Sequence, residues 1–249
     1  MVAPIVTGGN YLLRGLALLV QPGIRRYVII PLAINTLLFG LVIGYMVNWF
    51  HGIFGWIDNL LPSWLSWVEW LVIPILLTTF AATIFSILSM LINLLAAPFN
   101  TLLAERVEYH LTSQLPAGTP ITPAFLLTKT VPLLWNEIHK ILYALFWMIP
   151  FLLLFIVPVA NVAAPFLWLL YSAWMLAIQY VDLPMGNHEW SGKQVRQSLR
   201  RHRLLSMGFG GMTLLINTLP LINFVAMPAA VAGATLFWVE QLSKDQTAL

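Results

Sequence analysis

The chain alternates between long stretches without a charged residue and short stretches in which the charges gather. The charge-free stretches cover 27–57, 70–104, 141–181 and 204–239. A helix of roughly 20 residues crosses a hydrocarbon layer of about 30 Å, so the first two stretches are each long enough to span it once. We therefore predict membrane-spanning helices at about 27–50 and 70–104. The second exceeds the layer thickness and must tilt or project beyond it.

The last two stretches are interrupted near their middles by proline and asparagine. The breakers are Pro150, Pro158, Asn161 and Pro165 in the first, and Asn217, Pro220, Asn223 and Pro228 in the second. Each half holds about 16 or 17 residues, at or below the roughly 17 that a full crossing needs. We therefore predict two re-entrant helical hairpins, at about 141–181 and 204–239, that insert only part-way. Protein or water must cover their turns, because bare backbone in lipid is costly.

Composition supports a membrane environment and excludes several other classes of protein. Hydrophobic residues make up 60% of the chain and charged residues 8%, whereas a soluble domain has about 25% charged residues. The net charge of +3 is too slight to suggest nucleic acid as a partner, and the absence of cysteine excludes disulfides and thiolate metal sites. We expect one all-α membrane domain over residues 1–249, with no secretory signal and Met1 as its first residue.

The lysines and arginines predict the orientation in the membrane. Under this topology all 12 of them lie on one side, and the opposite loop, 51–69, has none. That loop carries Trp56, Trp64 and Trp67 instead, as expected of an interfacial belt. The positive-inside rule therefore predicts cytoplasmic N- and C-termini.

The strongest local motif is Gln21-Pro22-Gly23-Ile24-Arg25-Arg26, directly before the first apolar stretch. Proline and glycine predict a turn, and the residues that follow can begin a helix whose free N–H groups point outward. Such N–H groups beside two guanidiniums are an oxyanion site. The alternative is that Arg25 and Arg26 only anchor a membrane helix at its cytoplasmic end.

A second motif is a stripe of small and polar residues along the helix predicted at 70–104. Its members recur every three or four positions: Thr79, Ala82, Ser86, Ser89, Asn93, Ala97, Asn100 and Ala104. The stripe either lets another helix approach closely or lines a wet path. Just beyond it, Glu105, Arg106 and Glu108 form either a charge network near an ion path or an ordinary solvated helix end.

Two further segments carry candidate chemistry. The run from Asp182 to His188 contains Asp, Asn and His, but its spacing fits no metal signature, so we predict a structural turn that closes the first hairpin. Lys193, Arg196, Arg200, Arg201 and Arg203 predict a basic helix attracted to lipid headgroups. No Walker A, G-x-S-x-G or H-E-x-x-H motif occurs, so ATP-driven transport and common hydrolase chemistry are not supported.

Several short blocks resemble the CysZ family of bacterial sulfate permeases. They are Gly15-Leu16 with Leu19, Pro22 to Arg26, Ile30-Pro31-Leu32 with Asn35, Ala97 to Asn100 with Leu103-Ala104-Glu105, and Asp182 to Met185 with Asn187-His188. The blocks are spread over nearly the whole chain. The resemblance implies a homo-oligomer of the bacterial inner membrane that takes up sulfate for cysteine biosynthesis, with no cofactor. The family's sulfate-binding Gly-Leu-Arg motif maps onto Gly23, Ile24 and Arg25, with Arg26 adjacent.

The leading hypothesis is thus a sulfate permease, channel-like or proton-linked through Glu105, Glu108 or His188, and not an enzyme. We expect its pore or charge network among Asn35, Ser86, Ser89, Asn93, Asn100, Glu105, Arg106 and Glu108. The alternatives are a scaffold that assists other membrane complexes, or a lipid-modifying membrane enzyme. The enzyme would need a convergent catalytic set, which the sequence does not offer.

Overall fold

The computed structural model describes residues 2–60, 66–114, 123–219 and 223–244. Within these ranges, only the backbone is described for residues 2, 50–73, 87, 89–98, 123–137 and 223–224. Every regular element in these ranges is a helix. The elements are α1 (Val2–Leu18), α2 (Arg26–Leu60), α3 (Ser66–Thr112), α4 (Pro123–Ile156), the 3-10 turn η2 (Ala160–Val162), α5 (Ala164–Asn187), α6 (Gly192–Arg201), α7 (Arg203–Asn217) and α8 (Asn223–Glu240). The predicted all-α class is confirmed.

The chain divides into two compact units. Residues 1–28 and 100–249 form one, here called the core unit, and residues 29–99 form the other, here called the two-helix unit. The boundary between the two units falls near the start of α2 and toward the end of α3. The expectation of a single membrane domain over 1–249 stays a prediction.

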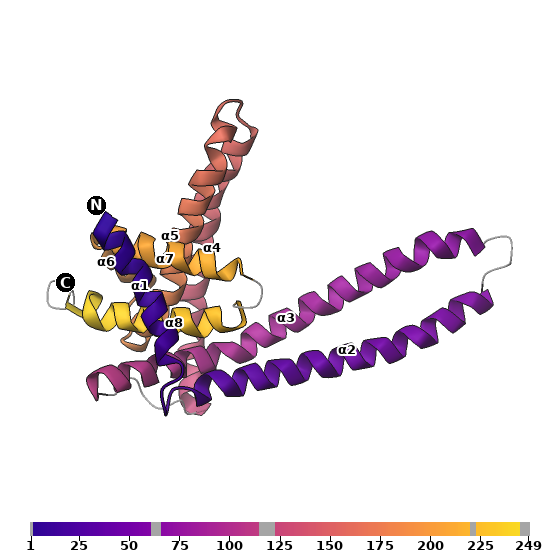
Figure 1. Cartoon of the computed structure of the whole chain (residues 1–249), viewed down its shortest axis with the longest axis horizontal. Coiled ribbons are helices and arrows are strands. Elements are labelled where there is room, and N and C mark those ends of the chain that lie inside the picture. Colours follow the sequence, from indigo (N-terminus) through magenta and orange to yellow (C-terminus); the bar gives the residue numbers. More distant parts are fainter. Residues whose placement is uncertain (1, 61–65, 115–122, 220–222, 245–249) are drawn as a thin grey trace. The chain divides into compact units, whose positions relative to one another are not determined.

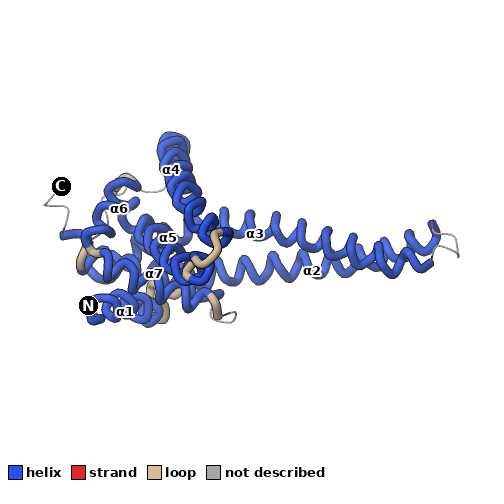
Figure 2. The backbone as a smooth tube through the Cα atoms, turned by 90° about the horizontal axis from the view of Figure 1, so that it is seen from above, coloured by secondary structure: helices blue, strands red, loops and turns tan. Residues whose placement is uncertain are grey.

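In the two-helix unit, α2 and α3 run side by side in opposite directions (Figures 1 and 2). Phe39 contacts Phe85 and Trp49 contacts Phe80, with ring centroids 5.7 and 4.4 Å apart. Both predicted spans are thus helical, and both helices extend beyond the predicted bounds. α2 is apolar enough to cross a membrane over Arg26–Trp49. Its exposed isoleucines and leucines suit contact with lipid.

The core unit is built on α1, which packs mainly against α7 and α8, with α5 against the same two helices. Glycines allow this close approach: a Cβ at Gly8 would overlap the Leu205 carbonyl, and one at Gly208 would overlap the Ile5 carbonyl. Arg14 of α1 also forms a two-pronged ion pair with Glu240 of α8, with Nη1 to Oε2 at 3.0 Å. No helix was predicted over 1–20, so α1 is the element that sequence reasoning missed.

The first predicted hairpin exists, but its arms are longer than predicted. α4 continues through Pro150 to Ile156 and α5 extends to Asn187 (Figure 1). Ile138–Ile156 and Ala164–Asn187 are both long and apolar enough to cross a membrane. The prediction of arms at or below the crossing minimum is therefore wrong. The arms were predicted too short because Lys140 and Asp182 were taken to mark the helix ends. Both charges lie inside the helices, where they form an ion pair across the hairpin, with Lys140 Nζ 2.8 Å from Asp182 Oδ2.

The second predicted hairpin has its arms where expected. α7 ends at Asn217 and α8 begins at Asn223, while Pro228 lies inside α8 rather than in the turn. Ser206, Phe209 and the run from Ala229 to Trp238 are almost all buried against the other helices of the core unit. These arms are therefore packed against protein, while residues 220–222 of the turn, for which cover was expected, lie outside the described residues.

The segment after α5 differs from the predicted turn. Asp182 and Pro184 lie within α5, and the chain turns only at His188, the residue that caps the helix. The basic helix is confirmed from Lys193 to Arg201 as α6, which begins with a capping box between Ser191 and Gln194, whereas Arg203 begins α7.

Candidate functional site

The predicted turn before α2 is present and is shaped by glycine. Gly23 has a φ of +93°, a conformation that L side chains rarely adopt. The N–H groups of Ile24 and Arg25 both donate to the Gln21 carbonyl at 3.2 Å, and Tyr27 N–H donates to the Ile24 carbonyl at 2.9 Å. The N–H groups of Ile24, Arg25 and Tyr27 are therefore bonded within the turn and not free, contrary to the expectation for these three residues. An anion here has to be bound mainly by side chains.

Ile24 anchors this turn while its neighbours face water. Its side chain is 2% exposed and belongs to the core cluster that includes Leu103 and Val107 of α3. Arg25 and Arg26 are both exposed. Because one buried residue fixes the turn, the two guanidiniums extend from an ordered base rather than from a loose terminus. Leucine and isoleucine can both fill an apolar site of this size, with a modest difference in packing.

A third arginine lies beside the turn. Arg106 Nε donates a hydrogen bond of 2.9 Å to the Tyr27 hydroxyl. The guanidinium carbons of Arg26 and Arg106 lie 5.0 and 5.8 Å from the centroid of the Tyr27 ring, within the range of cation–π attraction. We call Arg25, Arg26, Tyr27 and Arg106 the arginine cluster. It joins the start of α2 to the end of α3 within the core unit.

Acidic residues of α3 adjoin the arginine cluster. Burial raises the pKa of the Glu105 carboxyl; Arg106 acts in the opposite direction, and repulsion from Glu108 adds to the rise. Glu105 is thus more readily protonated than an exposed glutamate. A neutral Glu105 would leave the neighbouring arginines with more net positive charge for an anion.

Glu108 is buried and paired with a distant histidine. Its Oε1 lies 2.7 Å from His188 Nε2, and the His188 ring lies 5.2 Å from the Trp238 ring. Its other carboxylate oxygen, Oε2, is buried without a hydrogen-bond partner in the described part of the chain. At the end of α3, the buried Glu108 and the bonded Arg106 favour a charge network over a solvated helix end. The pairing of Glu108 with His188 was not predicted.

The other predicted pore residues fall into three groups. In the core unit, Asn100 donates from Nδ2 to Met227 Sδ at 3.3 Å. In the two-helix unit, Asn35 is half-buried, and the exposed Ser86 donates its hydroxyl to the Ala82 carbonyl of its own helix. The side chains of Ser89 and Asn93 lie outside the described residues.

The chemistry of the arginine cluster suits an oxyanion rather than a metal. Guanidiniums carry fixed positive charge and paired donors that match the geometry of tetrahedral oxyanions. Within the described part of the chain, no three His, Asp or Glu residues gather in a way that could hold a metal ion.

Comparison with known proteins gives a consistent result over nearly the whole chain. A family model described as sulfate transporter CysZ/etoposide-induced protein 2.4 matches residues 11–228. A protein of Pseudomonas fluorescens named sulfate transporter CysZ is 41% identical, over 97% of this chain and 96% of its own length. Proteins of the same name from Pectobacterium atrosepticum and Pseudomonas syringae are 39% and 36% identical, over 94% and 98% of this chain and 85% and 96% of their own lengths. The matched range contains the arginine cluster.

Proposed function

The chain belongs to the sulfate transporter CysZ/etoposide-induced protein 2.4 family, and we infer that it carries sulfate across a bacterial membrane. It is accordingly a transporter and not an enzyme. The observation that carries the proposal furthest is the arginine cluster: two exposed arginines on an anchored turn, with a third held beside them by Tyr27.

We propose that sulfate binds at Gly23, Ile24, Arg25 and Arg26. Arg25 and Arg26 supply most of the attraction, Gly23 permits the turn, and Ile24 fixes it through its buried side chain. The resemblance of these residues to the family's Gly-Leu-Arg motif supports the same assignment. Because most N–H groups of the turn are already bonded, the arginine side chains take the role that a helix N-terminus often plays.

From this site we propose that sulfate passes the charge network of Glu105, Arg106 and Glu108. The polar residues Asn35, Ser86, Ser89, Asn93 and Asn100 are the remaining candidates for the route. The Ser86 hydroxyl is bonded to a carbonyl of its own helix, which counts against a role for Ser86 in the route. A channel-like path is the simpler mechanism, and proton linkage would act through Glu105 or the Glu108–His188 pair.

The proposed setting is the bacterial inner membrane, with both termini cytoplasmic and sulfate uptake feeding cysteine biosynthesis. The one-sided distribution of lysine and arginine supports this orientation. The depth of the two hairpins remains a proposal, and we favour partial insertion for α7 and α8, which are short and covered by protein.

We also propose a homo-oligomer. A Cβ added at Gly40 or Gly44 of α2 would meet no other part of the described chain within 4 Å, and Thr79, Ala82 and Ser86 of α3 are exposed. These small residues, at helical spacing, find no partner helix within the two-helix unit. We propose that a second copy packs closely on them.

Labelled sulfate flux into proteoliposomes tests the proposal. Arg25→Ala combined with Arg26→Ala should reduce uptake at low sulfate by about ten-fold or more, as two charged contacts are lost. Lys193→Ala combined with Arg201→Ala removes equal charge from exposed positions on α6 and should leave uptake unchanged. Equal uptake by wild type and the Arg25/Arg26 variant would reject the site. No flux from the wild-type protein would favour a scaffold role.

A further inference from the structure

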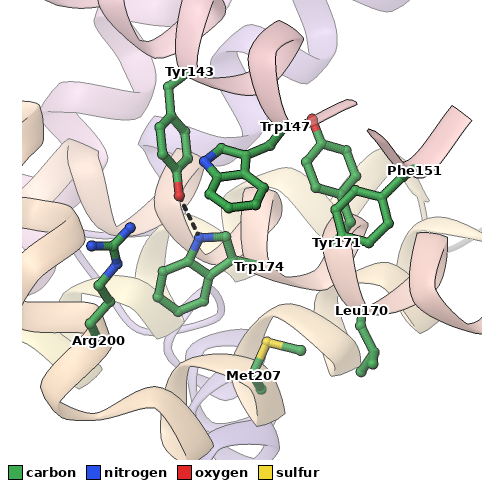
Figure 3. Close-up of a pocket in the computed structure, with 8 residues that line it drawn as sticks. All are labelled: Tyr143, Trp147, Phe151, Leu170, Tyr171, Trp174, Arg200 and Met207. Atoms are coloured by element: carbon green, nitrogen blue, oxygen red, sulfur yellow. Dashed lines mark hydrogen bonds between the residues drawn. The ribbon is translucent and has the colours of Figure 1, made fainter. Parts of the chain in front are cut away.

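A pocket in the core unit shares no residue with the arginine cluster and has a different composition. It has a volume of about 300 Å³ and is lined by residues of α4, α5, α6 and α7 (Figure 3). That volume is at the lower end of the roughly 300 to 1,000 Å³ typical of ligand sites. The transport route proposed above uses none of its residues.

Aromatic rings form most of the pocket wall. Tyr143, Trp147 and Phe151 follow one another at four-residue spacing, so they lie along one face of α4 over about 12 Å. Tyr171 and Trp174 of α5 face them (Figure 3). This elongated apolar wall suits a hydrocarbon chain better than a compact polar solute.

The polar tips of these aromatic residues are largely engaged already. Trp174 Nε1 donates to the Tyr143 hydroxyl at 3.3 Å, and the Tyr171 hydroxyl donates to the Ala144 carbonyl at 2.7 Å. Few unpaired polar atoms therefore remain along the wall to reject an apolar occupant.

Positive charge lies at one end of the aromatic row. Figure 3 shows Arg200 on the side of the pocket where Tyr143 and Trp174 lie, with Phe151 on the opposite side. Arg196, one turn earlier on α6, has its guanidinium carbon 4.7 Å from the centroid of the Tyr143 ring. The pocket thus has a cationic end and an apolar end.

This polarity decides which occupant fits. An aromatic cage could hold a quaternary ammonium group, but Arg196 and Arg200 repel a cation at the end where a headgroup would sit. A phospholipid with a net negative headgroup satisfies both ends, with its phosphate at the arginines and an acyl chain along α4. We propose that this pocket is a binding site for one anionic phospholipid, oriented with its headgroup at α6.

Native mass spectrometry of the detergent-purified full chain tests this, with phosphatidylglycerol and phosphatidylcholine as probes. The wild-type protein should retain phosphatidylglycerol in preference. Arg196→Gln combined with Arg200→Gln should weaken its binding by about twenty-five-fold, since each arginine near an anionic headgroup contributes a factor of about five. The charge-matched control, Lys193→Gln with Arg201→Gln, changes exposed residues of α6 outside the pocket and should bind as wild type.

A pocket-filling variant separates a built site from general surface attraction. Leu170→Trp adds bulk at an exposed pocket residue and keeps both arginines, so it should also lose phosphatidylglycerol. Equal retention of the two lipids by wild type would overturn the proposal, as would equal losses in the two double variants. Displacement of the lipid by millimolar inorganic phosphate would also overturn it, because it would identify a free-anion site instead.

Discussion

The hydrogen bond between Arg106 and Tyr27 should set how strongly the arginine cluster attracts sulfate. Tyr27→Phe removes the hydroxyl that accepts from Arg106 Nε at 2.9 Å and keeps the ring under both guanidiniums. A hydrogen bond to a charged group contributes about 1.5 to 3 kcal/mol when buried, and about 1 kcal/mol is reasonable for this half-buried pair. We therefore expect the KM for sulfate uptake to rise roughly five-fold.

Tyr27→Leu is the stronger perturbation, because it also removes the ring. Two cation–π contacts of about 0.5 to 1 kcal/mol each are then lost together with the hydrogen bond, for a total of roughly 2 to 3 kcal/mol. The KM should rise by about thirty-fold or more. Tyr27 acts by positioning Arg26 and Arg106, so the maximal flux should change far less than the KM in both variants.

Concentration-dependent flux in proteoliposomes measures both quantities, and Tyr109→Phe serves as the control because Tyr109 is an exposed tyrosine on the same helix as Arg106. Unchanged KM in both Tyr27 variants would refute the positioning role. A loss of maximal flux without a change in KM would refute it as well, since that result would place Tyr27 in a later step of transport.

Three further predictions concern the fold and its response to pH. Lys140→Met and Asp182→Leu should each lower the free energy of unfolding by about 1 to 3 kcal/mol, and the double variant should recover most of the loss, as measured by detergent titration. Gly208→Val should destabilise the protein by at least about 1 to 3 kcal/mol because its side chain would overlap the Ile5 backbone, whereas Gly211→Val on the same helix meets open space and should be tolerated. Sulfate affinity should rise as pH falls toward the raised pKa of Glu105, because the carboxylate beside Arg106 is then neutralised, and binding measured across pH should lose this dependence in Glu105→Gln.

The ends of a helix could be predicted from the sequence wherever residues next to each other in the chain determine them. Asn217 and Asn223 mark the ends of α7 and α8, as expected from the breakers between them. The ends of α4 and α5 could not be predicted in this way. Lys140 and Asp182 each look like a helix boundary alone, but they neutralise each other across 42 positions of sequence.

The same difference between local patterns and long-range contacts explains which residues of the arginine cluster could be predicted from the sequence. Arg25 and Arg26 follow a Pro-Gly turn and could be identified from six adjacent residues. Arg106 joins them through a contact 79 positions away, which no local pattern specifies. α1 did leave a signal, since Gly8 and Gly15 lie seven residues apart on a segment whose other residues are mostly apolar, a spacing that favours close helix packing.

The placement of the arginine cluster bears on how sulfate could move through the protein. Two unit charges 4 Å apart attract by about 1 kcal/mol in water and about 4 kcal/mol near a protein surface of lower effective dielectric. Arg25 and Arg26 are exposed, so their attraction lies toward the weaker limit, and only Arg106 is half-buried. A site of this kind raises the local concentration of sulfate without holding it tightly. Conduction requires such weak binding, because an ion that enters a channel must also leave. The exposure of Arg25 and Arg26 therefore favours the channel-like mechanism over a carrier that encloses its substrate.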